Sequence, residues 1–204
     1  MNYTKSLLLL SLSAVALLVS ACSNPADKTE SAKVADAVSN VEAAVGAKNY
    51  TISPDSKISF VGSKVTGSHD GGFETFNGTI ATVGGMIVPP SKVTIQTGSL
   101  WSDNDRLTGH LKSPDFFNVE TFPTAEFAVT SMSGDEMTGN LTLHGVTKSI
   151  TFKPEVTVTD SAITLKAEFD VMRFDFGIVY KGKADDLIRD EVVIRLDVKA
   201  VADA

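Results

Sequence analysis

The basic side chains of Arg106 and His110 are the first candidates for contacts with a polar ligand. They are four residues apart in a stretch with helical spacing, so both can project from one face of a short helix. A guanidinium and an imidazole in this arrangement could donate hydrogen bonds to a carbonyl oxygen or pair with a phosphate group. In the structural alternative, His110 satisfies buried backbone carbonyls while Arg106 pairs with Asp103 or Asp115. Structural ion pairs are common where elements meet, which favours this alternative.

Arg173 presents the same choice, because it could contact a ligand or pair with Asp175. Catalysis has less support in the sequence. The three histidines, His69, His110 and His144, are far apart and form no HExxH or other paired metal motif. The chain has no GxSxG motif either, and its single cysteine is better explained in another way. We therefore expect no catalytic residues, no metal and no cofactor, with a hydrolase that uses His110 together with Asp115 as the alternative.

A short helix over residues 104–113 must position the two basic side chains. Leu107 and Leu111 recur there at helical spacing, whereas the chain on both sides alternates apolar and polar residues with a period of two. Asp103 or Asn104 can act as the N-cap, and Pro114 ends the helix because proline disfavours helical geometry in the residue before it. The phenylalanines that follow in the same corner are Phe116, Phe117, Phe122 and Phe127. Such a cluster must cover something apolar.

Residues 48–204 are predicted to form one domain, made mostly of strands. Residues 163–171 and 192–200 alternate most clearly, which gives each strand one apolar face and one wet face. Residues 67–72 are expected to form a flexible hairpin loop, and residues 172–190 an irregular loop at a mouth. An antiparallel meander either packs as two sheets or closes on itself, and closure removes exposed edges. We predict an all-β antiparallel barrel of about eight strands, with a short helix between strands three and four.

A barrel of about eight strands can enclose one small ligand. The apolar strand faces would line its interior with aliphatic and aromatic side chains, so an elongated apolar molecule is the natural occupant. A sandwich with a filled core is the alternative, because periodicity alone does not distinguish a dry core from a tunnel. The wall residues expected to touch the ligand are Phe116, Phe117, Ile163, Leu165, Phe169, Ile194 and Leu196.

The N-terminal residues indicate export and lipid anchoring. Residues 1–21 have one positive charge at Lys5, then an apolar run and small residues, which is typical of a secretory signal peptide. Cys22, the only cysteine, stands where the small-residue pattern ends and resembles the acylated cysteine of a bacterial lipobox. An ordinary secretory signal is the alternative. Residues 22–47 contain no aromatic residue, and we expect them to form a flexible tether.

The net charge of −7 argues against a broad basic face for nucleic acid or for anionic lipid headgroups. Ser23 follows Cys22 directly. By resemblance to Gram-negative lipoproteins, the absence of aspartate at this position favours sorting to the outer membrane. We therefore expect a lipid-anchored, periplasm-facing protein of the cell envelope, whose membrane contact is made through the N-terminal lipid.

Four segments, taken in order, resemble one known family. They are residues 73–78 (FETFNG), residues 106–127 with the HL and DFF pairs, residues 139–148 (GNLTLHGVTK) and residues 173–177 (RFDFG). Together they resemble the YceI-like polyisoprenoid-binding family over nearly all of residues 48–204. No one segment is decisive, but the ordered set is specific.

The resemblance implies a periplasmic or secreted, lipocalin-like barrel that binds an isoprenoid lipid of the quinone or prenyl-phosphate type in its interior. The role would be that of a carrier, store or sensor. We expect the polar head of the ligand near Arg106 and His110. A hydrolase acting on a small lipid substrate and a structural envelope lipoprotein with a filled barrel are the alternatives. At the first strand many members carry a histidine, whereas here Ser63 to Gly67 stand and His69 follows later.

Overall fold

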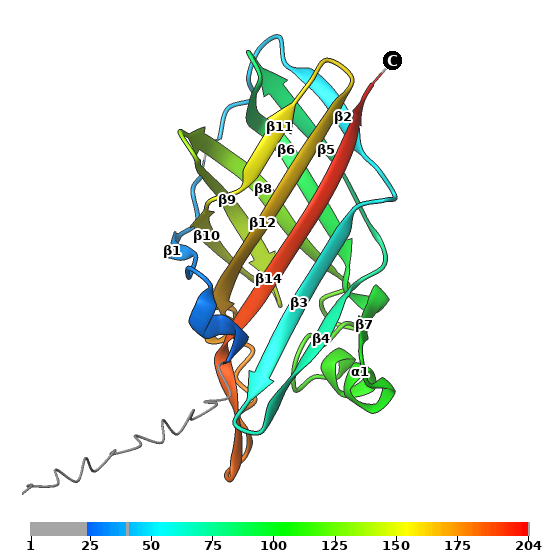
Figure 1. Cartoon of the computed structure of the whole chain (residues 1–204), viewed down its shortest axis with the longest axis vertical. Helices are drawn as coiled ribbons and strands as arrows, with labels where there is room; N and C mark the ends of the chain where they lie inside the picture. Colours follow the sequence, from blue (N-terminus) through cyan, green and yellow to red (C-terminus); the bar gives the residue numbers. More distant parts are fainter. Residues whose placement is uncertain (1–23, 40, 204) are drawn as a thin grey trace, which may run out of the picture.

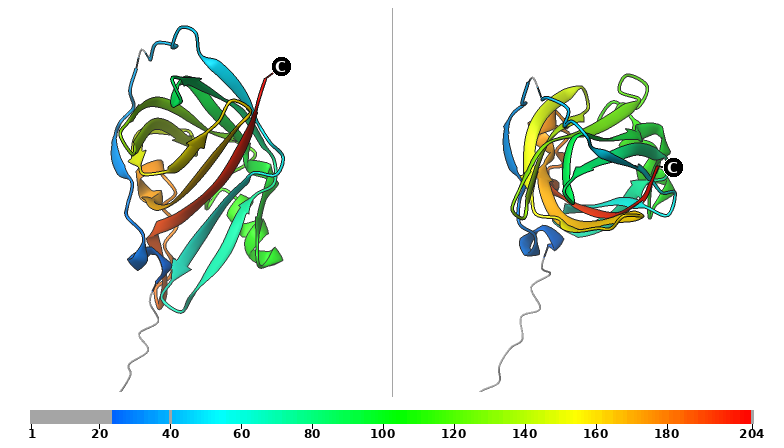
Figure 2. Two further views of the ribbon diagram at one scale, coloured as in Figure 1. Left: turned by 45° about the horizontal axis from the view of Figure 1, so that its top comes forward. Right: turned by 90° about the horizontal axis from the view of Figure 1, so that it is seen from above.

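The computed structural model describes residues 24–39 and 41–203, which form a strongly curved β-sheet with one α-helix near one end (Figure 1). Viewed from above, the strands form a ring (Figure 2). Within the described ranges no helix is long and apolar enough to cross a membrane. The signal peptide expected over residues 1–21 and the acylation site expected at Cys22 lie outside these ranges.

The strands are β1 (Lys33–Asp36), β2 (Lys48–Ile52), β3 (Lys57–Lys64), β4 (Gly67–Phe73), β5 (Phe76–Val83), β6 (Met86–Gln96), β7 (Leu100–Ser102), β8 (Thr124–Ser133), β9 (Glu136–Leu143), β10 (Val146–Phe152), β11 (Glu155–Val158), β12 (Ala162–Met172), β13 (Gly182–Lys183) and β14 (Asp186–Ala202). The helices are η1 (Pro25–Lys28), η2 (Thr97–Ser99), α1 (Asp105–Lys112) and η3 (Arg173–Phe176). The hydrogen-bonded order is β1-β10-β9-β8-β6-β5-β2-β14-β3-β4-β7. β12 pairs with the other edge of β14, and β11 pairs with β12.

The two most regular strands of the sequence, β12 and β14, lie side by side along the full length of β12. Ile163, Leu165 and Phe169 of β12 are buried, whereas the intervening Thr164 and Lys166 are exposed. Burying each large apolar side chain contributes about 1.5–3 kcal/mol, so the alternation decides which face of the strand turns inward. The predicted antiparallel barrel with one short helix is confirmed.

The predicted number of strands, about eight, is too low, because residues 24–39 and 41–203 form fourteen strands. One reason is that the chain around Pro54 forms two separate strands, β2 and β3. The loop expected over residues 67–72 is part of β4, which pairs with β3 and β7. A Cβ atom on Gly71 would lie 2.3 Å from Cζ of Phe60, so glycine here permits close packing rather than flexibility. With these additional strands, the helix falls between β7 and β8.

The N-terminal segment differs from the flexible tether that we expected over residues 22–47. Ser31 forms a parallel bridge with Asp170 of β12, and β1 then pairs with β10. The hydroxyls of Thr29 and Ser31 each donate to the buried Asp170 carboxylate at 2.7 Å, which compensates for its removal from water. The segment therefore connects β12 to β10, two strands that do not pair with each other.

The helix α1 begins and ends where its caps predict. The Asn104 side chain accepts a hydrogen bond from the backbone amide of Leu107 at 3.0 Å, and the helix stops before Pro114. Its buried residue Leu111 packs in a cluster that includes Phe116. The expected corner is only partly present: Phe116 and Phe117 pack with Leu111, whereas Phe127 belongs to the main core cluster and Phe122 packs against His144.

Candidate functional site

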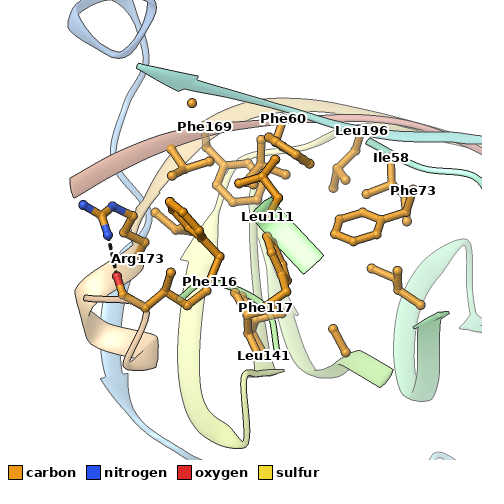
Figure 3. A pocket seen from close by; sticks show the side chains of 18 of the residues that line it. Ile58, Phe60, Phe73, Leu111, Phe116, Phe117, Leu141, Phe169, Arg173 and Leu196 are labelled. Atoms are coloured by element: carbon orange, nitrogen blue, oxygen red, sulfur yellow. Dashed lines mark hydrogen bonds between the residues drawn. The ribbon is translucent and has the colours of Figure 1, made fainter. Parts of the chain in front are cut away.

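An apolar cavity of about 390 Å³ lies inside the barrel (Figure 3). Among its lining residues only Gly62, Ser63, Lys64, His69 and Arg173 are not hydrophobic. The hydrophobic lining residues are Ile58, Phe60, Phe73, Val93, Ile95, Leu107, Leu111, Phe116, Phe117, Ala125, Phe127, Leu141, Leu143, Ile150, Phe152, Phe169, Val171, Ile178, Ile188, Val192, Ile194, Leu196 and Val198. Such a wall favours hydrocarbon, because a sugar or another polar molecule would lose its hydrogen bonds to water there.

A second, smaller cavity of about 60 Å³ adjoins the first. The residues that line both cavities are Val93, Phe127, Phe152, Leu196 and Val198. Leu165 and Met137 line only the smaller one, together with other hydrophobic residues of the barrel wall. The apolar space therefore extends along the barrel, which suits an elongated ligand.

Aromatic rings form much of the wall of the main cavity. Phe152 and Phe169 stack with their ring centroids 4.2 Å apart and an interplanar angle of 13°. Phe60, Phe73 and Phe117 form a second group, with centroids separated by 5.7 to 6.4 Å. Packed rings have few accessible rotamers, so they give the cavity a defined shape.

Most of the predicted ligand-binding residues lie at this cavity. Those that line the main cavity are Phe116, Phe117, Phe169, Arg173, Ile194 and Leu196. Leu165 lines the smaller cavity, whereas Ile163 is fully buried and lines neither. Arg106 and His110 line neither cavity. The apolar part of the predicted site is therefore brought together, and the predicted polar pair is not.

His110 lies behind the cavity wall. Its Nε2 atom is 2.9 Å from a carboxylate oxygen of Asp115, and its ring packs edge-on against Phe116 and Tyr180. Arg106 is exposed and has no ion pair within residues 24–39 and 41–203. The structural alternative is therefore wrong in its partners, because His110 pairs with a carboxylate instead of backbone carbonyls and Arg106 pairs with neither Asp103 nor Asp115.

Arg173 is buried and donates hydrogen bonds to three backbone carbonyls. Nε donates to Arg189 O at 2.9 Å, Nη1 to Ile178 O at 2.6 Å, and Nη2 to Ile188 O at 3.2 Å. Burial lowers the pKa of Arg173, an effect that the negative charge of Asp190 partly opposes. Because an arginine pKa is so high, the guanidinium stays charged near neutral pH. In Figure 3 it is turned away from the labelled phenylalanines.

Two of the three carbonyls bound by Arg173, those of Ile188 and Arg189, lie where β14 is irregular. The pairing of β14 with β3 shifts its register between Ile188 and Val192, so this part of β14 departs from a regular ladder. The arginine therefore supplies donors that the neighbouring strand does not. No ion pair joins Arg173 to Asp175 in the described part of the chain. Arg173 is best described as a clamp on the segment that borders the cavity.

Two polar lining residues, Lys64 and His69, were not among the predicted contacts. Lys64 forms an ion pair with Asp186, and Nδ1 of His69 lies 2.8 Å from Oδ1 of Asp103. The hydrogen bond from His69 is the main cause of the lowered pKa of Asp103. His69 and Phe73 lie on the same face of β4, because alternate residues of a strand share a face. The glycines of this segment suggest a loop, so the alternation was not recognised in the sequence. We call the end of the cavity at Lys64 and His69 its mouth.

Within residues 24–39 and 41–203, no group of three or more His, Cys, Asp or Glu side chains is arranged to hold a metal ion. His110 and Asp115 form a pair, but it does not line the cavity. The residues that do line it could bind a ligand through apolar contact along the wall and through charge at the mouth.

Comparison with known proteins places this geometry in a family. Residues 50–200 match the model of the YceI-like domain. A UPF0312 protein of Pseudomonas putida strain W619 is 35% identical over 120 residues, covering 52% of this chain and 61% of that protein. A second UPF0312 protein, from Pseudomonas putida strain F1, is 46% identical over 66 residues, covering 30% of this chain and 34% of that protein. The chain thus aligns with less than two thirds of the length of these relatives.

Solved structures share the fold at low sequence identity. A polyisoprenoid binding domain from Saccharophagus degradans superposes with a TM-score of 0.63 at 18% identity, covering 77% of this chain and 99% of that domain. The YCEI protein of Campylobacter jejuni gives a TM-score of 0.55 at 22% identity, covering 66% of this chain and 85% of that protein. Since the family model spans most of the described residues, the chain belongs to the YceI-like domain family.

Proposed function

We propose that the cavity binds one long isoprenoid lipid, with the polar head of the lipid at the mouth. The observation that carries this proposal is the distribution of polarity: the wall is hydrophobic, while the polar side chains of Lys64 and His69 occur at the mouth. The similarity to a solved polyisoprenoid binding domain supports an isoprenoid as the ligand class. The protein would then act as a carrier, store or sensor of this lipid.

Hydrophobic burial would provide most of the affinity. Each methylene group removed from water contributes about 0.8 kcal/mol. The cavity of about 390 Å³ and its extension of about 60 Å³ offer this burial along the barrel. The phenylalanine groups around Phe60 and Phe169 give the wall a fixed form, so that little conformational entropy is lost when a chain enters.

The head group is proposed to bind near Lys64 and His69, because Arg106 and His110 do not line the cavity. The Lys64 ammonium would attract an anionic phosphate, although its ion pair with Asp186 offsets part of this attraction. His69 is held through Nδ1 by Asp103, which leaves Nε2 as the ring atom available to a phosphate or quinone oxygen. Both head-group classes suggested by the family resemblance are therefore chemically compatible with the mouth.

Replacing both mouth residues, Lys64→Met with His69→Phe, should weaken binding of a polyprenyl phosphate by about tenfold or more. The physical reason is that a hydrogen bond to a charged group contributes about 1.5–3 kcal/mol. Binding of an isoprenoid hydrocarbon of equal length should change little. Isothermal titration of both ligands measures the difference. The control is Arg106→Ala, which should bind like wild type. A larger loss of affinity in this control than in the mouth variant would indicate that the head group binds near α1.

Release of inorganic phosphate distinguishes binding from catalysis. We propose that a bound polyprenyl phosphate is left intact, since the His110–Asp115 pair does not line the cavity. Phosphate released by the purified wild-type protein, and abolished by His110→Ala, would instead favour a hydrolase.

The proposed location is the cell envelope, with the protein anchored through an acylated Cys22. The support comes from the sequence, in which Cys22 ends a signal-like segment and is the only cysteine. The absence of aspartate after Cys22 favours the outer membrane as the anchoring membrane in a Gram-negative cell.

Changing Cys22→Ser should move the protein from the membrane fraction to the soluble fraction. The reason is that the serine variant cannot be acylated, and the acyl chains would provide the stable anchor. Immunoblotting of fractionated cells measures the distribution. A variant that stays in the membrane pellet at the wild-type level would show that another segment provides the anchor.

A further inference from the structure

Four exposed hydrophobic side chains lie near the mouth, on the β3–β4 turn, on η3, on the loop after η3 and at the start of β14. The exposed fractions are 71% for Val65, 39% for Phe174, 59% for Val179 and 48% for Leu187. The backbone amide of Val65 donates to Leu187 O at 3.2 Å, which joins the β3–β4 turn to the start of β14. We call these four residues the apolar rim. Large apolar side chains that gather around an opening indicate an interaction surface.

Each residue of the apolar rim is adjacent in sequence to a residue that lines the cavity. These lining neighbours are Lys64, Arg173, Ile178 and Ile188. The Arg173 guanidinium also ties the loops together, since it donates to the carbonyls of Ile178 and Ile188. The rim and the cavity wall are therefore built from the same segments, and a surface that met the rim would meet the opening of the cavity.

The N-terminal segment approaches the same end of the barrel. In Figure 1, η1 lies beside the lower part of β14. Asp27 of η1 is 3.3 Å from the Arg189 guanidinium, and Arg189 immediately follows the lining residue Ile188. Two residues of fully extended chain reach at most about 7 Å, so a lipid on Cys22 would be held close to Asn24 and η1. A short connection would keep this end of the barrel near the membrane.

The charges around the rim are mixed. The exposed charged residues between η3 and β14 include Lys181 and Lys183. Asp175 of η3 and Asp185 are also exposed there. Opposite charges in similar number give no strong attraction to anionic headgroups. Contact with a bilayer would depend on inserting apolar side chains, at about 25 cal/mol per Å² of apolar surface buried.

We propose that the apolar rim docks on the surface of a phospholipid bilayer, so that a lipid passes between membrane and cavity without crossing water. This inference rests on the proposed isoprenoid function and on the proposed anchor at Cys22. It explains why exposed hydrophobic side chains adjoin lining residues at the end of the cavity whose polar residues would suit a lipid head group. It also gives the ordered N-terminal segment a role, because a flexible tether would not orient the barrel.

Docking is tested first without any ligand. The full-length acylated protein is placed in phosphatidylcholine vesicles with an environment-sensitive fluorophore on Leu187→Cys or, as the control, on Met86→Cys. Met86 is 59% exposed at the β5–β6 turn, far along the barrel from the rim. We expect blue-shifted emission and protection from iodide at position 187 only. Equal exposure of both positions to iodide, or labelling of unaltered Cys22, would overturn the proposal.

Lipid transfer is tested second. Val179→Ser with Leu187→Ser should slow the uptake of radiolabelled polyprenyl phosphate from donor vesicles by about tenfold or more, since two apolar contacts with the bilayer are lost. Affinity for the same lipid in detergent solution should stay unchanged, and Met86→Ser should transfer at the wild-type rate. Equal rates for the rim and control variants would contradict docking. If wild type binds no polyprenyl phosphate, the proposed function fails, and the fluorescence result still decides docking.

Discussion

Ile194→Arg is expected to lower the affinity for a polyprenyl phosphate by at least about 100-fold, which corresponds to about 2.7 kcal/mol. Ile194 lies in β14 and lines the main cavity, where it packs against both large hydrophobic clusters. A guanidinium there would occupy the space of the lipid chain and would lack a paired carboxylate, which costs several kcal/mol. Titration of the folded variant with the lipid in detergent solution measures the loss.

Two further variants separate lost binding from lost folding. Val201→Arg places the same charge at an exposed position of the same strand and should bind like wild type. Leu141→Trp adds apolar volume to the cavity wall without adding charge, so it should block long chains while the protein remains folded. Wild-type affinity in both Ile194→Arg and Leu141→Trp would show that the cavity is not the binding site.

Arg173→Met should lower the free energy of unfolding by about 3 kcal/mol or more. The methionine fills similar space but leaves the carbonyls of Ile178, Ile188 and Arg189 without their donor. A hydrogen bond to a charged group contributes about 1.5–3 kcal/mol, and a buried unpaired carbonyl adds a penalty of its own. Urea unfolding followed by circular dichroism measures the change.

The matched control for this prediction is Arg189→Met. The Arg189 side chain is partly exposed and pairs with Asp27 and Glu191, so its loss should cost at most about 1 kcal/mol. Equal midpoints for the two variants would contradict the role of Arg173 as a clamp. Loss of lipid binding in Arg173→Met without loss of stability would instead indicate direct contact with the head group.

The sequence predicted those parts of the fold that follow from local pattern. Apolar alternation identified β12 and β14, and the helical spacing of Leu107 and Leu111 with the stop at Pro114 identified α1. The same alternation correctly placed Phe169, Ile194 and Leu196 in the cavity wall. These predictions succeed because burial of one strand face depends on period-two spacing, which is visible in a single sequence.

The strand β4 and the position of its His69 at the mouth were not predicted, because the glycines of this segment suggested a loop. Gly71 and Gly72 were interpreted as flexible, yet they lie in β4 because Phe60 and Trp101 pack too closely to admit a Cβ. Nothing local reveals such a contact, since the partner rings are distant in sequence or follow a turn. His69 was therefore assigned to a loop, although it lines the cavity.

Long-range hydrogen bonds explain the other differences. Asp170 accepts hydrogen bonds from Thr29 and Ser31, more than 130 residues away, and this contact orders a segment whose composition suggests a tether. Arg106 and His110 share a helix, but helical spacing does not determine which face turns toward the barrel. Burial of Leu111 determines it, and the basic side chains are consequently outside the cavity.

The most direct test of the central claim is the dependence of affinity on chain length in a series of polyprenyl phosphates that share one head group. Each buried methylene should add up to about 0.8 kcal/mol, so affinity should rise with each isoprenoid unit and level off when the cavity is full. Leu141→Trp should level off at a shorter chain than wild type does. Affinity that is independent of chain length, or equal affinity for short soluble sugars, would contradict an isoprenoid-binding cavity and favour a filled barrel.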